Sequence, residues 1–275
     1  MLEWFETIRE DISMPTTYTH HRFGRDCLDV LPEKARLAAL AYPGLYGTGT
    51  HGPDIFFYYR AVCPNRVSAY GSALHHQSAR LIFTLARRNL PSCADKDAAF
   101  AYLLGFLTHF TLDSTCHGYV NSAAAALGVS HNRLEAVYDA HMMRLDGRTP
   151  TQVCRAEHLE PTAENAAVIA HVFDMPERTV LSALRGQARI MRLLYSPDGL
   201  KKHILRGAIR FSHLPGDFDG LFIDDETPPE LTGAVARLDE LYAEALHEYP
   251  ALVSALTEFL AGHAELPERF ERDFE

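Results

Sequence analysis

Hydrophobic residues recur at helical spacing along most of the chain, and no alternating, strand-like pattern runs for long. The most apolar stretch, residues 100–117, carries aromatic and aliphatic side chains on every side, as expected of a buried helix. The pattern predicts an all-α protein organised around this central helix. Other helices are predicted at residues 2–12, 23–31, 69–89, 98–107 (leading into the central helix), from 130 onward, 163–173, 176–194, 200–209, 231–246 and 251–260.

Two segments interrupt the helical pattern. Residues 42–65 are rich in glycine and proline and predict loops. Residues 214–230 are acidic, but their aspartates do not match the spacing of a calcium-binding loop, so a solvated loop is expected there. The chain shows no internal repeat, and 275 residues with 47% hydrophobic content can build one large core. We therefore expect a single compact domain.

The overall charge narrows the possible partners. A net charge of −10 argues against a non-specific nucleic-acid binder, which needs a basic surface, and against docking by simple attraction to anionic lipid. It is compatible with a chain that holds cations.

The cysteines and the N-terminus indicate the compartment. Five cysteines without a CxxC pair are typical of free thiols in a reducing compartment. The first residues are neither basic nor followed by a long apolar run, so they do not predict a secretory signal. No segment has the roughly 20 apolar residues of a transmembrane helix, and the cytoplasm is the expected location. The cysteines are Cys27, Cys63, Cys93, Cys116 and Cys154.

The central helix carries His109, Asp113 and His117, each four residues from the next. Residues at this spacing lie along one stripe of a helix, with a rise of roughly 6 Å per step. His109 and His117 are thus about 12 Å apart and cannot share one ion through metal–nitrogen bonds of about 2 Å. A buried carboxylate between two histidines needs a partner to offset its desolvation, and a cation would supply it. If the helix binds metal, it serves at least two ions.

Other candidate ligands surround this motif in the sequence. His131 and Glu135 are four residues apart and share a face of their predicted helix. Asp54 follows a Gly-Pro turn, where an aspartate can either cap the next helix or line a pocket.

Two adjacent histidine pairs add further candidates: His20 with His21, and His75 with His76. Neighbouring side chains on a helix point about 100° apart, so at most one of His20 and His21 is expected to face an interior site. Either His75 or His76 could be a ligand.

Mixed nitrogen and oxygen ligands of this kind suit zinc, and a set of three leaves an open position for water. Zinc lowers the pKa of a bound water from 15.7 towards about 7, and neighbouring ions can clamp opposite oxygens of a phosphoryl group. The predicted reaction class is phosphoester hydrolysis.

Over about positions 14–150 the sequence resembles the zinc-dependent phospholipase C family, whose superfamily includes the single-strand nucleases of the S1/P1 type. The resemblance implies an all-helical, compact multi-helix domain of the phospholipase C/P1 nuclease type, with a trinuclear zinc cluster at the bottom of a cleft. It rests on Met14–His20, His51–Asp54, Leu74–His75, His109-x3-Asp113-x3-His117 and His131-x3-Glu135.

The resemblance also implies a role for each motif residue. One zinc would be held by Asp54, His75, His109 and Asp113; a second by His117, His131 and Glu135; a third by His20 with Asp113, which would bridge two ions. Asp54 would also be the catalytic residue that orients or deprotonates the attacking water. The implied organisation is an N-terminal extension helix at residues 1–13, a zinc-binding helical core at 14–150, and a C-terminal helical portion at 151–275 packed on the same domain.

Three departures from the family pattern bear on these expectations. In secreted members the amine and carbonyl of a processed N-terminal residue complete the third zinc site, so here either translation starts near Met14 or that site lacks those ligands. Two to three zinc ions are therefore expected. The step from Asp113 to His117 is shorter than in the secreted enzymes, and the aromatic run at residues 56–59 either forms a pocket wall or packs in the core.

The predicted function is a zinc-dependent phosphodiester hydrolase acting on a phospholipid headgroup or a related soluble phosphoester. One alternative is a single-strand nuclease of the same superfamily. A nuclease would need aromatic stacking platforms and gains little from the charge of −10, so no stable nucleic-acid partner is expected. The other alternative is a non-catalytic protein in which zinc staples the fold. The oligomeric state stays open.

Overall fold

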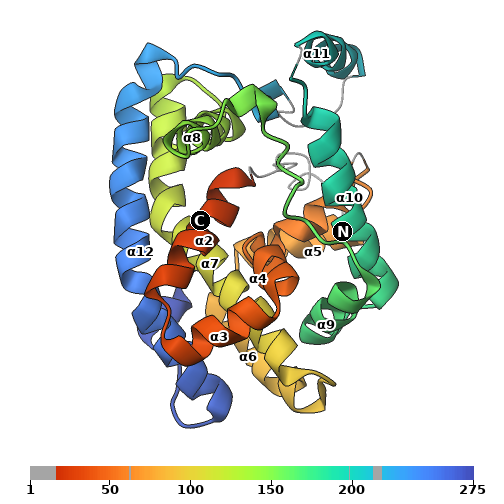
Figure 1. The fold of residues 1–275 in the computed structure, drawn as a ribbon, viewed down its shortest axis with the longest axis vertical. Coiled ribbons are helices and arrows are strands. Elements are labelled where there is room, and N and C mark those ends of the chain that lie inside the picture. The colour runs from red at the N-terminus through yellow and green to blue at the C-terminus, as the bar shows by residue number, and fades with distance from the viewer. Residues whose placement is uncertain (1–16, 62, 198, 213–218) are drawn as a thin grey trace, which may run out of the picture.

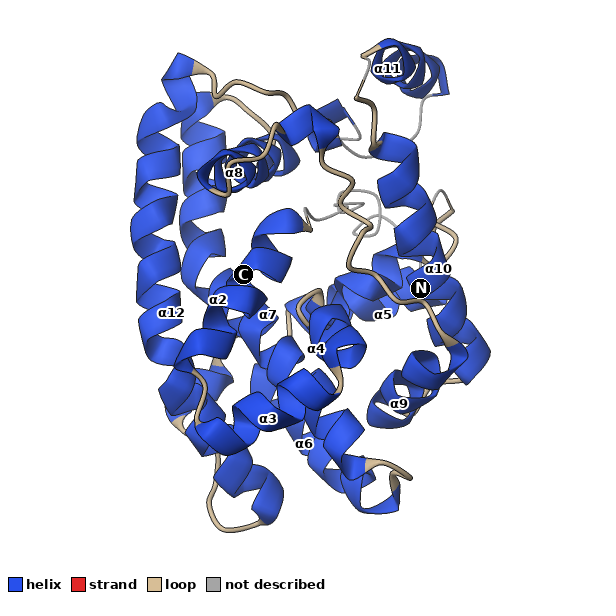
Figure 2. Cartoon of the chain, viewed as in Figure 1, coloured by secondary structure: helices blue, strands red, loops and turns tan. Residues whose placement is uncertain are grey.

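The computed structural model describes residues 17–61, 63–197, 199–212 and 219–275 (Figure 1). Within these residues every regular element is helical (Figure 2), which confirms the predicted all-α class. The helix predicted at residues 2–12 lies outside the described residues. No helix in the described ranges has the length and apolar character needed to cross a membrane.

The helices follow one another with short connections. The α-helices are α2 (Tyr18–Val30), α3 (Glu33–Ala41), α4 (Pro43–Gly49), α5 (Arg66–His75), α6 (Ala79–Asn89), α7 (Lys96–Leu127), α8 (His131–Leu145), α9 (Ala163–Phe173), α10 (Glu177–Leu194), α11 (Leu200–Ser212) and α12 (Thr232–Ala261). The short 3-10 helices are η1 (Gly52–Tyr58), η2 (Leu90–Ser92), η3 (Pro150–Gln152), η4 (Asp219–Leu221), η5 (Pro229–Leu231) and η6 (Glu268–Glu271).

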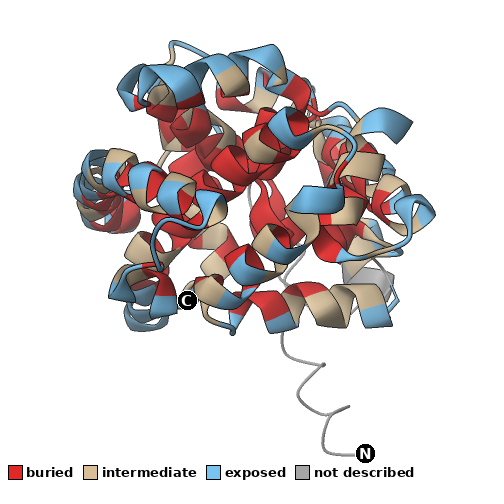
Figure 3. Cartoon of the chain, turned by 90° about the horizontal axis from the view of Figure 1, so that it is seen from below, coloured by how far each residue is buried: buried red, intermediate tan, exposed pale blue. Residues whose placement is uncertain are grey.

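Helix α7 is the central element, as the apolar pattern predicted. The Asp95 side chain caps its N-terminus by accepting from the Ala98 N–H, and Gly128 ends it in the left-handed conformation. Every residue from Ala101 to Asp113 is buried. Helices α2, α3, α4 and α12 pack around it, and Figure 3 shows buried residues gathered in the interior, with the exposed faces of the helices turned outward.

The loop prediction for residues 42–65 is wrong over Pro43–Gly49 and Gly52–Tyr58, where α4 and η1 form. Its glycines permit a close approach between α4 and α7. A Cβ atom on Gly49 would lie 2.4 Å from the Tyr102 carbonyl oxygen, and one on Gly105 would lie 2.1 Å from the Tyr46 carbonyl oxygen. The residues that lower helix propensity locally are therefore the ones that allow the two backbones to pack together.

The prediction of a single helix at residues 69–89 is wrong, because the helix breaks between α5 and α6. Helix α5 ends at His75, whose carbonyl accepts a hydrogen bond from the Phe274 N–H at 3.1 Å. Ser78 Oγ donates to the Phe270 carbonyl at 2.9 Å. The C-terminal segment thus pairs with polar groups that the break exposes.

The prediction of two separate helices on either side of Pro250 is wrong, because these residues form one continuous helix, α12. The neighbouring Tyr249 is fully buried, and its hydroxyl donates to the Leu104 carbonyl of α7 at 2.9 Å. Packing against α7 on both sides of Pro250 outweighs the hydrogen bond that a proline removes.

Gly105→Ala tests whether the backbone contact between α4 and α7 holds the fold. The added methyl group is expected to lower the free energy of unfolding by about 2 kcal/mol, because the Tyr46 carbonyl must move. Gly118→Ala on the same helix is the control: nothing lies within 4 Å of the position that its methyl group would take, so a gain of up to about 1 kcal/mol is expected. Urea unfolding measures both, and equal effects would contradict the proposed contact.

Candidate metal centre

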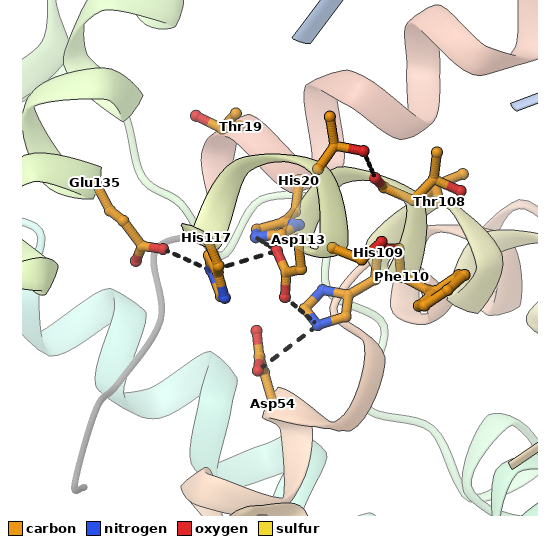
Figure 4. Close-up of polar contacts among 12 residues, drawn as sticks. Thr19, His20, Asp54, Thr108, His109, Phe110, Asp113, His117 and Glu135 are labelled. Atoms are coloured by element: carbon orange, nitrogen blue, oxygen red, sulfur yellow. Dashed lines mark hydrogen bonds and ion pairs between the residues drawn. The ribbon is translucent and has the colours of Figure 1, made fainter. Parts of the chain in front are cut away.

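Side chains from five helical elements converge on one side of α7. Figure 4 shows members from α2, η1, α7 and α8. Helix α7 itself supplies three of them at successive turns. The others come from α2, η1, α5 and α8, which lie far apart in the sequence. The converging residues are the eight singled out from the sequence: His20, Asp54, His75, His109, Asp113, His117, His131 and Glu135.

The first donor group joins Asp54, His75 and His109. Asp54 Oδ1 lies 2.8 Å from His75 Nε2 and 3.9 Å from His109 Nε2. His75 Nδ1 lies 2.8 Å from the Gly71 carbonyl, to which only a protonated Nδ1 can donate. A neutral His75 therefore turns the lone pair of Nε2 towards a carboxylate, an arrangement that needs a cation or a second proton between the two atoms.

The second donor group places Asp113 between histidines. Its Oδ2 atom lies 2.9 Å from His109 Nε2, while Oδ1 lies 3.3 Å from His20 Nε2 and 3.6 Å from His117 Nε2. His109 is fully buried, yet neither of its ring nitrogens makes a hydrogen bond of acceptable geometry within the described chain. Buried polar atoms without partners are rare, and His109 Nε2 faces the carboxylate oxygens of Asp54 and Asp113.

The third donor group lies one turn further along α7. Glu135 Oε1 is 3.0 Å from His131 Nε2 and 3.3 Å from His117 Nε2, whereas Oε2 is buried without a hydrogen-bond partner among the described residues. His131 Nδ1 lies 2.7 Å from Asn121 Oδ1, to which it donates. As in His75, Nδ1 of His131 makes a hydrogen bond to a group outside the donor set, and Nε2 faces a carboxylate.

The three groups are separate but contiguous. Within each group the ligand atoms lie within 4.8 Å of one another: His20, His109 and Asp113; Asp54, His75 and His109; His117, His131 and Glu135. His109 and His117 do not share a group, in agreement with their predicted separation along the helix axis.

The electrostatics of the site favour positive charge. Burial alone lowers the pKa of His117, but the carboxylates of Asp113 and Glu135 outweigh it and raise that pKa to about 10. Burial also opposes ionisation of Asp113, yet the imidazoles of His109 and His117 hold its pKa well below the usual range. His131 and His117 lower the pKa of Glu135 in the same way. At neutral pH both carboxylates are ionised, and cationic partners must balance them.

The structure resolves the alternatives left open by the sequence. His20 faces the site, while His21 turns away and stacks on His158 at 3.8 Å between ring centroids. His75 is buried in the site and His76 is exposed.

Asp54 and the aromatic run after it are also resolved. The Asp54 carboxylate faces His75, with Oδ1 2.8 Å from Nε2, and η1 has no side-chain cap. Phe56 and Tyr58 pack in the core, whereas Phe57 stacks on His75 at 5.3 Å. Phe57 therefore lies against the site.

Asp139 on α8 is a positioning residue that the sequence analysis missed. It is fully buried and accepts from the Tyr18 N–H at 3.2 Å, the Thr19 N–H at 2.8 Å and the Thr19 hydroxyl at 2.7 Å. Thr17, at the N-cap position of α2, makes no side-chain capping bond. Asp139 caps α2 from another helix and so fixes His20. The four-residue spacing between Asp139 and Glu135, which puts both on one face of α8, was the sequence feature that could have drawn attention to Asp139.

The C-terminal segment also reaches the site without any signal in the local pattern. The Phe274 ring packs against His75 at 5.7 Å and against His109 at 5.8 Å between centroids. The Phe274 ring therefore covers His75 and His109 with an apolar surface.

A model of the family described as zinc dependent phospholipase C matches residues 19–171, which is more than half of the 275 residues. The chain belongs to the zinc-dependent phospholipase C family. The matched range contains all eight converging residues, and the all-α fold agrees with the fold that the resemblance implied. No curated protein and no solved structure gives a significant match.

The residues present fit the zinc that the family name implies. Imidazole nitrogens and carboxylate oxygens are ordinary zinc ligands, and each group offers three of them. The buried His109 Nε2 and Glu135 Oε2 atoms, which lack hydrogen-bond partners in the described chain, would gain a partner in a bound ion.

Zinc uptake is expected to release protons. His117 carries a proton at pH 7 because its pKa is about 10, and an imidazole must lose that proton to coordinate. Apparent affinity at this group should therefore rise between neutral and mildly alkaline pH, by up to about tenfold per pH unit. Calorimetric titration of the zinc-free protein in two buffers of different ionisation enthalpy measures the release. Identical heats in the two buffers would contradict the charge state assigned to His117.

Proposed function

We propose that this protein is a zinc-dependent phosphodiester hydrolase that acts on a phospholipid headgroup or a related soluble phosphoester. The observation that supports this most strongly is the position of Asp113, whose two oxygens face His20, His109 and His117 together. Donor groups that share a carboxylate hold their ions close to one another, as phosphoryl transfer by paired metals requires.

We propose two to three zinc ions, with His20, Asp54, His75, His109, Asp113, His117, His131 and Glu135 as ligands. When bound, zinc supplies Lewis-acid stabilisation of phosphoryl oxygens and a water acidic enough to attack near neutral pH. The outer hydrogen bonds of His75 to Gly71 and of His131 to Asn121 hold the rings in the ligating tautomer.

We assign Asp54 the catalytic role. It sits on η1 at the edge of the donor groups, and Oδ1 is positioned by His75 at 2.8 Å. A carboxylate held this way can orient a water molecule and accept its proton as the phosphorus is attacked. Burial of Asp54 excludes competing bulk water from the same oxygen atoms.

A small cavity of about 30 Å³, room for about one water molecule, lies beside the donor groups. Its polar lining comes from the site itself and its apolar lining from α7, α8 and α12. The lining residues are Thr19, His20, Leu112, Asp113, Cys116, His117, Val120, Glu135, Tyr138 and Leu238.

The core and the C-terminal portion are proposed to act as one domain. Helix α12 packs on α7, and Phe274 packs against two of the proposed ligands. The five cysteines are free thiols, which supports our placement of the protein in a reducing compartment such as the cytoplasm.

Asp54→Asn tests the proposed reaction. The amide keeps a coordinating oxygen but is a poor proton acceptor, so turnover should fall at least about 100-fold while most bound zinc is retained. Hydrolysis of p-nitrophenyl phosphocholine, phosphatidylcholine and single-stranded DNA is measured together with zinc content by elemental analysis. Asp239→Asn, which changes a carboxylate on α12 that contacts Tyr138 and His141, is the control and should keep full activity.

The substrate panel separates this function from its alternatives. Cleavage of DNA alone would make the protein a nuclease, and bound zinc without turnover of any substrate would leave a structural metal site. Unchanged turnover in Asp54→Asn would refute the role assigned to Asp54.

A further inference from the structure

The charges of the chain are strongly segregated. Residues 175–212, which span α10 and α11, contain eight Lys and Arg residues and only two Asp and Glu residues, a local charge of +6. The whole chain carries −10, so the remainder carries −16. A basic region inside so acidic a protein is a local surface feature that the overall charge conceals.

Helix α10 gathers four of these charges on one face. Arg178, Arg185, Arg189 and Arg192 are all exposed, and at 100° per residue they lie within about 60° of one another around the helix axis. None of them makes an ion pair or a side-chain hydrogen bond with another described residue. The stripe is therefore free to bind an external anionic surface.

The opposite face of α10 is held tightly against the body of the protein. Val180, Leu184, Ala188 and Met191 are buried there. A Cβ atom on Gly186 would lie 2.1 Å from the Tyr58 carbonyl oxygen of η1. The arginine stripe contributes nothing to this packing, so packing does not explain why four arginines occupy the exposed face.

Helix α11 adds exposed aliphatic side chains at the end of the same region. Leu200 is 67% exposed and Ile204, one turn later, is 63% exposed, while Leu193 at the end of α10 is 51% exposed. Figure 1 shows α11 beyond the end of α10, at the periphery of the molecule and away from α7. Leu200 and Ile204 are the most exposed large hydrophobic side chains of the described residues, and they lie one turn apart.

The polar contacts of α11 hold it in this orientation. Lys202 and Arg206 form ion pairs with Asp224, and Lys201 donates to the Arg192 and Tyr195 carbonyls at 2.9 and 2.8 Å. The basic side of α11 thus anchors the helix, and Leu200 and Ile204 remain on its exposed side.

We propose that α10 and α11 form a docking face for anionic phospholipid bilayers. The arginine stripe would bind anionic headgroups, and the three aliphatic side chains would enter the boundary between headgroups and acyl chains. Single-stranded nucleic acid is the weaker match, because its stacking contacts need aromatic rings and the exposed side chains here are aliphatic. The docking face comprises Arg178, Arg185, Arg189, Arg192, Leu193, Leu200 and Ile204.

The proposal departs from the expectation that the net charge of −10 argues against docking by simple attraction to anionic lipid. It lies outside the donor groups around α7, so docking and hydrolysis can be measured separately. Docking would bring the proposed hydrolase to a surface composed of its substrate, but vesicle binding is observed whether or not the protein hydrolyses a phosphodiester.

Vesicle flotation of the full chain tests the proposal. The protein should bind vesicles of phosphatidylcholine that contain phosphatidylglycerol, bind pure phosphatidylcholine vesicles weakly, and lose binding as salt is raised. Changing Arg178, Arg185, Arg189 and Arg192 together to Gln should lower affinity for the anionic vesicles roughly 100-fold or more.

The matched control changes four exposed basic residues elsewhere to Gln: Lys34, Arg36, Arg66 and Lys96. This variant has the same net charge as the stripe variant, but it should bind anionic vesicles like the unmodified chain. A double variant, Leu200→Ser with Ile204→Ser, should weaken binding and leave its salt dependence in place. All three variants should hydrolyse monomeric p-nitrophenyl phosphocholine at the rate of the unmodified chain, which also shows that they fold.

Several results would overturn the proposal. These are the absence of binding to anionic vesicles, an equal loss in the stripe and control variants, and binding of single-stranded DNA through the stripe in place of vesicles. A dimer in light scattering that Leu200→Ser with Ile204→Ser dissociates would instead assign the aliphatic side chains to a second copy of the chain. Vesicle binding without hydrolysis of any phosphodiester would support docking and refute only the proposed function.

Discussion

A buried carboxylate at the centre of α7 places the strongest constraint on this structure. Asp113 lies in the interior with His20, His109 and His117 around it, and an ionised carboxylate in such a place is unstable without cationic partners. Protonated histidines balance it in the absence of metal, and zinc would do so more completely. The elements that approach α7 are those that bring these partners.

The site residues outside α7 are positioned by different local contacts. His20 is fixed because Asp139 caps α2 from α8. His75 comes into position where α5 ends and the C-terminal segment takes up its carbonyl. The approach of α4 to α7 through Gly49 and Gly105 determines where η1 begins and hence where Asp54 lies. The site therefore depends on packing over the whole chain and on more than the matched motif residues.

Much of this could be predicted from the sequence because it is encoded locally. The apolar pattern around residues 100–117 identified the central helix, and steps of four residues placed His109, Asp113 and His117 on one face. The same reasoning separated His109 from His117. The family resemblance supplied the distant members, including Asp54, whose place in a turn was compatible with two roles.

The remaining features could not be predicted because they depend on contacts between distant residues. The spacing from Glu135 places Asp139 on the site-facing side of α8, but only a distant contact shows that it caps a helix about 120 positions earlier. Nothing near Phe274 indicates a position against His109. Glycines in α4 read as loop formers until their contact with α7 is known. A summed net charge could not reveal the arginine face of α10, because charge and its distribution are different quantities.

Anomalous X-ray scattering at the zinc edge from zinc-loaded crystals would test most directly whether cations gather these side chains. We expect one zinc peak between Asp54, His75 and His109, and another between His117 and Glu135, with Asp113 adjoining the cluster. Zinc bound elsewhere, or none at all with the donor groups unchanged, would show that hydrogen bonds alone hold the cluster together and would contradict a metal centre on α7.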